Sequence, residues 1–235
     1  MNILAIETSS EACSCALRLS DGSLRERHVL AARQHTQLLL PMLDSLLSEA
    51  GLALSAVDCF AFGRGPGSFT GVRIAASAIQ GLALAADRPV VAISSLAALA
   101  AGCEKSATSV LAVFDARMNE VYLGAFHLDA DGLPTPSQAE QLGSAESIQL
   151  PNAGHWHGVG AGWPVHGEAL ARRLGQRLLS VAPDSLPGAR QVARLALGPA
   201  QAGEGVAAEL ALPNYLRREV ASTLRQRQAA AAKEI

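Results

Sequence analysis

Apolar and polar residues alternate over the first part of the chain. An apolar run covers residues 3–6, and a polar turn follows at Thr8 to Ser10. After the turn, small residues alternate with larger apolar ones: Ala12, Ser14 and Ala16 against Cys13, Cys15, Leu17 and Leu19. A period of two is typical of a strand with one buried face, and two such runs joined by a short polar turn predict a β-hairpin. The chain therefore opens on a predicted hairpin.

The same plan returns in the middle of the chain. An apolar run at 110–114 is followed by a polar connector at 115–120 and a further apolar run at 121–126. Each predicted hairpin precedes a series of alternating helices and strands, which predicts two similar α/β lobes facing each other across a cleft. Two such lobes correspond to an actin-like or RNase H-like plan.

The remaining pattern predicts the other elements of each lobe. We expect helices at 36–50, 69–86, 167–174 and 189–197, and strands at 56–62, 89–93 and 156–159. We expect an N-terminal lobe at 1–102, a C-terminal lobe at 103–216 and a C-terminal helix or tail at 217–235. A short stretch of mostly small and polar residues at 102–108 is the expected linker between the lobes.

The two predicted N-terminal helices are more apolar than one core-facing stripe requires. The helix at 36–50 is rich in leucine, and the helix at 69–86 has one charged residue, Arg73, among many small ones. A helix that is apolar on all sides is either deeply buried or part of an interface. We favour an interface for the first helix, whereas burial within its own lobe stays open for the second. The candidate interface residues are Leu39, Met42, Leu43, Leu46, Leu47, Val72, Ala75, Ala76, Ala78, Ile79 and Leu82.

A glycine-rich segment, GRGPGSFTG at 63–71, leads into the predicted helix at 69–86. Such a turn directs backbone N–H groups and the positive end of the helix dipole toward one point, and Ser68 or Thr70 suits the N-cap. The turn matches neither common nucleotide-binding glycine pattern, so either it binds an anion or its glycines only allow close packing. The candidate anion or nucleotide contacts are Gly65, Gly67, Ser68 and Thr70, with Glu7 and Asp115 at the ends of the two hairpins.

Composition and charge narrow the function further. A formal net charge of -2 and 4% aromatic residues argue against a chain that binds RNA by itself. The longest apolar stretch, at 74–86, is shorter than the roughly 20 residues of a membrane span, and the N-terminus lacks the basic region of an export signal. We therefore expect a cytoplasmic protein without a membrane segment, whose four cysteines remain thiols.

The histidines do not form a metal-binding pattern. His35 is alone at the start of a predicted helix, where a cap or a surface position is the usual role. His155 and His157 lie two residues apart, but no third ligand is near them in the sequence. We predict no metal site and no catalytic residue in this chain.

Four segments resemble the signature blocks of the TsaB (YeaZ) family, which consists of tRNA threonylcarbamoyladenosine biosynthesis proteins. They are ILAIETSS at 3–10, GPGSFTGVRI at 65–74, DARMNEVY at 115–122 and PNYLR at 213–217. The blocks occur in the family's order and span most of the chain, while residues 127–210 resemble the family only vaguely.

The resemblance implies an ASKHA (actin-like ATPase, RNase H-like) fold and an accessory role. Members of this family pair with a catalytic paralogue, TsaD, which transfers threonylcarbamoyl to N6 of adenosine 37 in tRNAs that read ANN codons; the ATPase TsaE joins the complex. In the family the two apolar helices form the seam with TsaD or with a second copy. The resemblance thus implies a scaffold subunit without its own cofactor, with ATP or ADP at the level of the complex and tRNA reached indirectly.

Two departures from related enzymes support the accessory role. The catalytic paralogue carries a His-x-x-x-His pair that holds a metal on one helix face, whereas the comparable stretch here is SSLAALA at 94–100. Kinase loops of the superfamily begin Asp-x-Gly, whereas this chain has Glu7, Thr8 and Ser9. The alternatives are a self-sufficient enzyme, either a small-molecule kinase or a glycopeptidase-like hydrolase, and a homodimeric binding protein. A basic tail after Tyr215 is either a tRNA contact or a solvated end.

Overall fold

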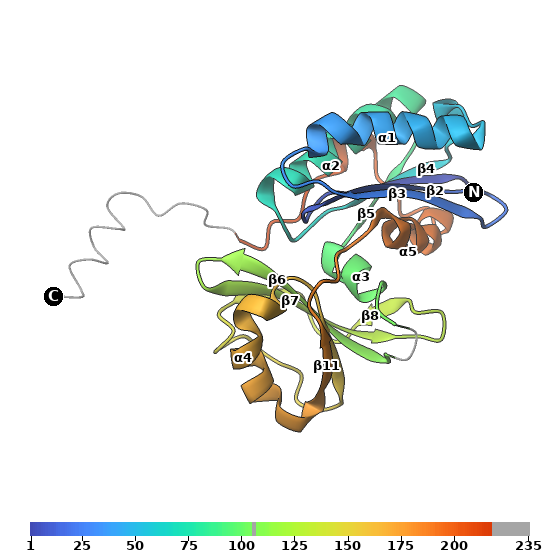
Figure 1. Ribbon diagram of the computed structural model, residues 1–235. Coiled ribbons are helices and arrows are strands. Elements are labelled where there is room, and N and C mark those ends of the chain that lie inside the picture. The colour runs from blue at the N-terminus through green and yellow to red at the C-terminus, as the bar shows by residue number, and fades with distance from the viewer. Residues whose placement is uncertain (105–106, 218–235) are drawn as a thin grey trace.

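The computed structural model describes residues 1–104 and 107–217 and consists of two α/β lobes (Figure 1). Each lobe contains one sheet, and each sheet begins with an antiparallel hairpin followed by strands that run parallel to its first strand. The prediction of two similar lobes, each opened by a hairpin, is therefore confirmed. Part of the expected linker, residues 105–106, and the expected tail after Arg217 lie outside the described residues.

The first lobe has a five-stranded sheet with the order β3-β2-β1-β4-β5. Its strands are β1 (Ile3–Glu7), β2 (Ala12–Arg18), β3 (Leu24–Leu30), β4 (Cys59–Gly63) and β5 (Val90–Ile93). Every residue of β1 and β4 is buried, because helices cover both faces of the sheet at these central strands. The outer face carries α1 (His35–Ala50) and α2 (Phe69–Ala86), and the short 3-10 helix η1 (Leu54–Ala56) precedes β4.

The second lobe has a sheet with the order β11-β10-β6-β7-β8, and β9 also pairs with β7. Its elements are β6 (Ser109–Arg117), β7 (Glu120–Leu128), β8 (Pro134–Pro136), β9 (Gln141–Gly143), β10 (Trp156–Val159), α4 (Trp163–Leu174), η2 (Gly175–Arg177) and β11 (Leu178–Ala182). Helix α4 follows β10 in the second lobe, as α2 follows β4 in the first lobe. In the first lobe α1 precedes β4, whereas in the second lobe a loop at 144–155 precedes β10. The internal repeat is thus real but incomplete.

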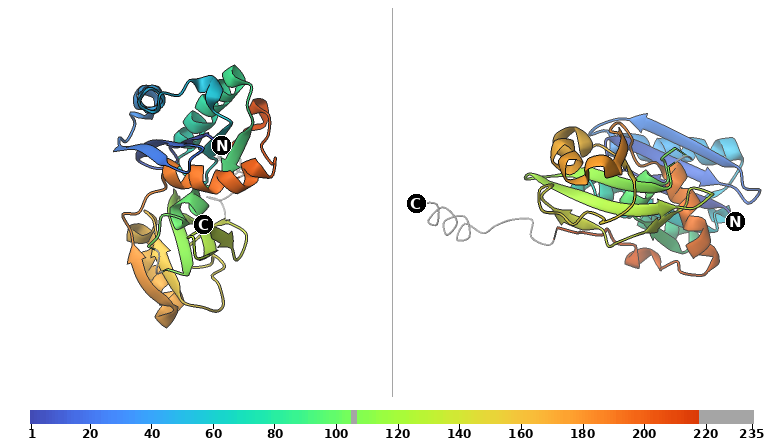
Figure 2. Two further views of the ribbon diagram at one scale, coloured as in Figure 1. Left: turned by 90° about the vertical axis from the view of Figure 1, so that its right-hand side faces the viewer. Right: turned by 90° about the horizontal axis from the view of Figure 1, so that it is seen from below.

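The predicted boundary of the second lobe is wrong beyond residue 188. Helix α5 (Ala189–Gln201) packs on the inner face of the first sheet, where Ala189 and Val192 share a core with Ile3 and Ala5. The chain then continues along the first lobe through η3 (Ala208–Leu210). An amphipathic helix buries its apolar stripe wherever an uncovered apolar surface is available, and the inner face of the first sheet provides that surface. Figure 2 shows α5 between the two lobes.

Helix α3 (Ser95–Ala100) connects the lobes. It begins directly after β5, and its Leu96 and Leu99 pack against β6 and β7 of the second lobe. By length and composition α2 meets the criterion for a membrane span. Its buried side chains, however, pack with those of β1 and β4, and we assign it as a core helix of the first lobe.

Candidate functional site

The glycine-rich turn packs closely against the turn of the first hairpin. The Ser68 N–H donates to the Ser9 carbonyl at 2.7 Å, and the Ser68 hydroxyl caps α2 by accepting from the Gly71 N–H at 3.3 Å. A Cβ atom at Gly67 would lie 2.5 Å from the Ser9 carbonyl oxygen. Gly65 is buried, whereas Ser68 and Thr70 are exposed. Close packing therefore explains Gly67, and two N–H groups expected to face an anion are already bonded within the chain.

Glu7 is enclosed at the centre of the first lobe, with 0% of its surface exposed. Its Oε1 accepts from the Ser9 N–H at 2.6 Å, and its Oε2 accepts from the Ser95 hydroxyl at 2.7 Å. Gly63 makes room for the carboxyl group, because a Cβ there would lie 1.8 Å from Oε2. Glu7 thus ties the end of β1 to the turn of the first hairpin at Ser9 and to Ser95 at the start of α3. The expectation that Glu7 contacts a nucleotide is wrong for this structure, because the side chain has no accessible surface.

Replacing Glu7 by glutamine should stabilise the protein at neutral and alkaline pH. Burial raises the pKa of Glu7 above its usual 4.5, against the opposing effect of the hydrogen bonds from Ser9 and Ser95. The contribution of this group to stability is therefore complete below the unfolded pKa and is lost as the pH rises through the folded pKa. Glutamine retains the acceptor for the Ser9 N–H but carries no charge.

The measurement is the Tm of both proteins at intervals from about pH 4 to about pH 8. The variant should gain stability relative to the parent as the pH rises, whereas the exposed Glu11→Gln control should follow the parent. A Tm difference between Glu7→Gln and the parent that does not change with pH would contradict the assignment.

Asp115 lies at the end of β6 and is held by partners from its own lobe. Its Oδ1 accepts from the Arg117 N–H at 2.9 Å and lies 3.2 Å from Nε2 of His166, a buried residue of α4. Partial burial raises the pKa of Asp115, but the hydrogen bonds from Arg117 and His166 and the charge of Arg117 together hold it below its usual value. The side chain is 18% exposed, so it retains some access to solvent. Within the described residues no hydrogen bond or ion pair joins it to Glu7.

Sequence reasoning missed His166, because a lone histidine within a helix pattern carries no signal of the carboxylate that it meets. It also placed His35 at a cap or at the surface, whereas His35 is buried and its Nε2 lies 3.1 Å from the Ser10 carbonyl oxygen and 3.2 Å from that of Ala12. His157 Nδ1 contacts the Ser180 hydroxyl at 2.8 Å. Residues 1–104 and 107–217 contain no group of three His, Cys, Asp or Glu side chains placed to hold a metal ion.

The predicted interface is wrong for most of its residues. Seven of the eleven side chains lie in the core of the first lobe because they face the sheet: Leu39, Leu43, Leu46, Val72, Ala75, Ala76 and Ile79. The other four are half-buried at the edges of the two helices: Met42, Leu47, Ala78 and Leu82. The apolar arc is wide because each helix covers a broad part of the sheet.

An apolar face nevertheless remains between α1 and α2. Helix α1 lies over β2 and β3, and its flank with Ser45 and Glu49 is tied to β3 by the ion pair of Arg27 with Glu49. The opposite flank of α1, which carries Leu40 and Leu47, therefore points toward α2, which lies over β4 and β1. Leu40 is 56% exposed.

Helix α2 contributes the other side of this face. Its Arg73 donates to the Tyr215 hydroxyl at 2.8 Å, and its Gln80 donates to the Ala211 carbonyl at 3.3 Å, so this flank is covered by the C-terminal segment. The opposite flank therefore points toward α1. We call the two facing flanks together the α1–α2 face; its residues are Leu40, Leu47, Ile74, Ala78 and Leu82. Figure 2 shows the two helices side by side on the outer face of the sheet.

Comparison with known proteins identifies the family. The family model described as "TsaD: tRNA N6-adenosine threonylcarbamoyltransferase" matches residues 29–223. The Escherichia coli protein named tRNA threonylcarbamoyladenosine biosynthesis protein TsaB is 42% identical, with 94% of this chain and 96% of that protein covered. The chain belongs to the TsaB family. The TsaB protein of Haemophilus influenzae is 38% identical over 94% of this chain and 95% of its own length.

The fold of this TsaB family member also agrees with a solved structure. The structure titled "YeaZ from Pseudomonas aeruginosa" superposes with a TM-score of 0.83 at 46% identity, covering 92% of this chain and 99% of that one. The resemblance carried by the four sequence blocks is therefore confirmed, and the fold of the chain is that of the YeaZ structure. The matched region includes α1 and α2 of the first lobe and every element of the second lobe from β6 to β11.

Proposed function

We propose that this chain is the accessory subunit of the complex that forms N6-threonylcarbamoyladenosine at position 37 of tRNAs reading ANN codons. The curated relatives that cover nearly the whole chain are biosynthesis proteins for this modified nucleoside. The observation that carries the proposal is the α1–α2 face, an apolar surface left uncovered in a chain of this family. In this role the chain docks a TsaD-type catalytic partner and holds it in an active arrangement.

The region that this chain shares with TsaD proteins supports docking through this face. The model built on TsaD proteins matches residues that include both helices, so a TsaD-type partner has equivalents of α1 and α2 at the same place in its fold. Two similar surfaces pair most simply about a pseudo-two-fold axis, and four helices packed in this way bury both apolar faces at once. A second copy of this chain offers the same surface, so a homodimer is the expected competitor when no partner is present.

The buried Glu7 supports a role without catalysis by this chain. In ATP-using proteins with this fold a carboxylate at the first hairpin serves the metal or the nucleotide, whereas here both Glu7 oxygens are bonded to Ser9 and Ser95. Helix α3, where the resemblance places two histidines in the catalytic paralogue, instead fills the core with Leu96 and Leu99. The self-sufficient kinase or hydrolase is accordingly disfavoured. We place ATP or ADP, TsaE and the tRNA contact at the level of the complex, in the cytoplasm.

The proposal is tested by reconstitution of tRNA modification. Purified TsaD and TsaE are combined with TsaC, a further protein of the same pathway, and with tRNA, threonine, bicarbonate and ATP. Threonylcarbamoyladenosine is then measured by mass spectrometry of the digested nucleosides. We expect product only when this chain is added to its partners, and none from the chain alone. Full product formation without the chain, or turnover by the pure chain, would refute the accessory role.

A further inference from the structure

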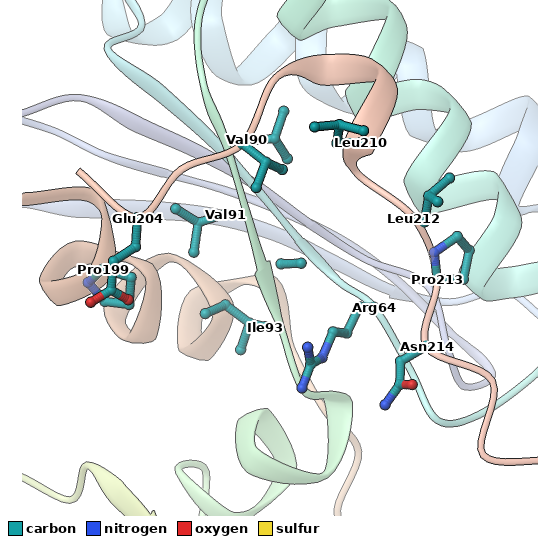
Figure 3. Close-up of a pocket in the computed structure, with 12 residues that line it drawn as sticks. Arg64, Val90, Val91, Ile93, Pro199, Glu204, Leu210, Leu212, Pro213 and Asn214 are labelled. Atoms are coloured by element: carbon teal, nitrogen blue, oxygen red, sulfur yellow. The ribbon is translucent and has the colours of Figure 1, made fainter. Parts of the chain in front are cut away.

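A cavity of about 400 Å³ lies along β5, on the side of the first lobe where the C-terminal segment returns. Its walls include Val90 and Ile93 from the strand and Leu210 and Leu212 from that segment (Figure 3). Small-ligand sites typically measure about 300–1,000 Å³ and combine apolar walls with a few polar groups. The cavity is separate from the α1–α2 face, because the flank of α2 that is covered by the C-terminal segment lies between them.

The cavity exposes an unpaired stretch of a sheet edge. Strand β5 ends the sheet, and the Val90 N–H and C=O bond to Val206 at 2.8 and 2.9 Å. Ala92, two residues further on, directs its N–H and C=O to the same side, because successive residues of a strand in a parallel pair alternate in direction. Neither group has a hydrogen-bond partner within residues 1–104 and 107–217. An extended chain can add to such an edge.

A cation stands at one end of this edge. Arg64 aligns with the carboxyl end of β5, since its N–H donates to the Ile93 carbonyl at 2.8 Å, and its buried Nε has no hydrogen-bond partner within the described chain. Figure 3 shows its side chain beside Ile93 and Asn214, while Glu204 lies at the other end of the cavity. A guanidinium group binds carboxylates through two parallel hydrogen bonds, so a buried and unpaired donor here favours an anionic ligand.

One carboxylate of the second lobe lies near this end. Burial raises the pKa of Glu140 above its usual value, although the hydrogen bond from Ser94 and the positive charge of Arg64 both act to lower it. Glu140 accepts from the Ser94 hydroxyl, and no ion pair joins it to Arg64 in the described part of the chain. The negative charge of Glu140 therefore opposes a carboxylate ligand at Arg64 without occupying the guanidinium group.

We propose that this cavity binds the free C-terminal end of a peptide. The terminal carboxylate meets Arg64, and an aliphatic side chain packs against Leu210 and Leu212. The carbonyl of the last-but-one peptide group accepts from the Ala92 N–H, and the N–H of the last peptide group donates to the Ala92 carbonyl. Because Arg64 lies at the carboxyl end of β5, the bound peptide runs parallel to this strand. The pair of free backbone groups on Ala92 favours a peptide over a simple carboxylic acid.

The test uses acetyl-alanyl-valyl-leucine as the probe, titrated into the isotope-labelled full chain and followed by the amide NMR signals. We expect the Ala92 and Val206 signals to move, and the C-terminal amide of the same peptide to bind at least about tenfold more weakly. Equal binding of the acid and the amide, or unmoved signals at Ala92, would overturn the proposal. Free leucine that binds as tightly as the peptide would also overturn it.

Three variants separate the roles of the charges. Arg64→Gln should remove the preference for the free carboxylate, whereas Arg88→Gln, an exposed arginine outside the cavity, should leave binding unchanged. Glu140→Gln retains a partner for Ser94 but removes the opposing charge, so it should tighten binding of the acid form only. Because this last effect is a gain, it does not depend on whether Arg64→Gln folds. Unchanged acid binding in Glu140→Gln would count against a carboxylate at Arg64.

Discussion

Replacing Ala78 by arginine should abolish formation of threonylcarbamoyladenosine by the reconstituted complex while the isolated chain stays folded. Ala78 is half-buried in the α1–α2 face, one turn from Ile74 and from Leu82. An arginine there holds the partner helices apart and places an unpaired charge in an apolar interface, at a cost of roughly 3–5 kcal/mol. A loss of this size weakens the complex more than about 100-fold.

The measurement is co-elution with TsaD on size exclusion, together with the nucleoside assay. Val165→Arg is the matched control, because Val165 is 65% exposed on α4 of the other lobe. It should leave both readouts unchanged. Leu43→Arg is not a substitute for Ala78→Arg, since Leu43 is 3% exposed and a charge there should unfold the lobe. Normal co-elution and product with Ala78→Arg would show that the partner docks elsewhere.

Replacing Gly71 by alanine should strongly destabilise the fold. A Cβ at Gly71 would lie 1.9 Å from the Thr8 carbonyl oxygen, and the Thr8 hydroxyl donates to the Gly71 carbonyl at 2.8 Å. Both atoms that would clash are fixed to backbone, so relief requires α2 to move away from the first hairpin. We expect a loss of about 3 kcal/mol or more in the free energy of unfolding. For a chain of this length that corresponds to a Tm lower by about 6–12 °C.

Gly81→Ala is the matched control for Gly71→Ala. Gly81 lies in the same helix, and within the described part of the chain no atom beyond its neighbours and the backbone of its own helix lies within 4 Å of the position of its added Cβ. In the isolated chain this substitution should raise stability by about 0.5–1 kcal/mol, because alanine is the better helix former. Thermal unfolding of both variants and of the parent measures these changes in stability. If Gly71→Ala is as stable as the parent and only loses activity with the partners, the glycine serves a ligand and not the packing of α2 on the hairpin.

Several elements of the fold could be predicted from local pattern alone. The two hairpins were recognisable because a period of two over a few residues identifies a half-buried strand. Helix α2 was predicted with its observed bounds, since Ser68 caps its start and its apolar periodicity continues to residue 86. For the glycines of the turn the sequence left two interpretations open, anion binding and close packing of backbones, and it did not show what they approach. That partner, the turn at Thr8 and Ser9, lies about 60 residues earlier in the chain.

The candidate site was harder to predict, because each of its residues depends on a distant contact. Glu7 fits a ligand-binding carboxylate until Ser95 and Gly63 are seen to enclose it. Composition does not distinguish the leucines of α1 that face the sheet from those that face α2, because both sets are equally apolar.

The sequence by itself determined the two hairpins, the lobed α/β plan and the family, since each of these follows from patterns within short, contiguous segments of the chain. Only the tertiary structure decided which sides of α1 and α2 stay uncovered, that α5 completes the first lobe, and that Arg64 and Ala92 border one cavity. The physical reason is that burial is a property of surfaces brought together from distant parts of the chain. A local pattern records that a side chain is apolar or charged but not which surface it will meet.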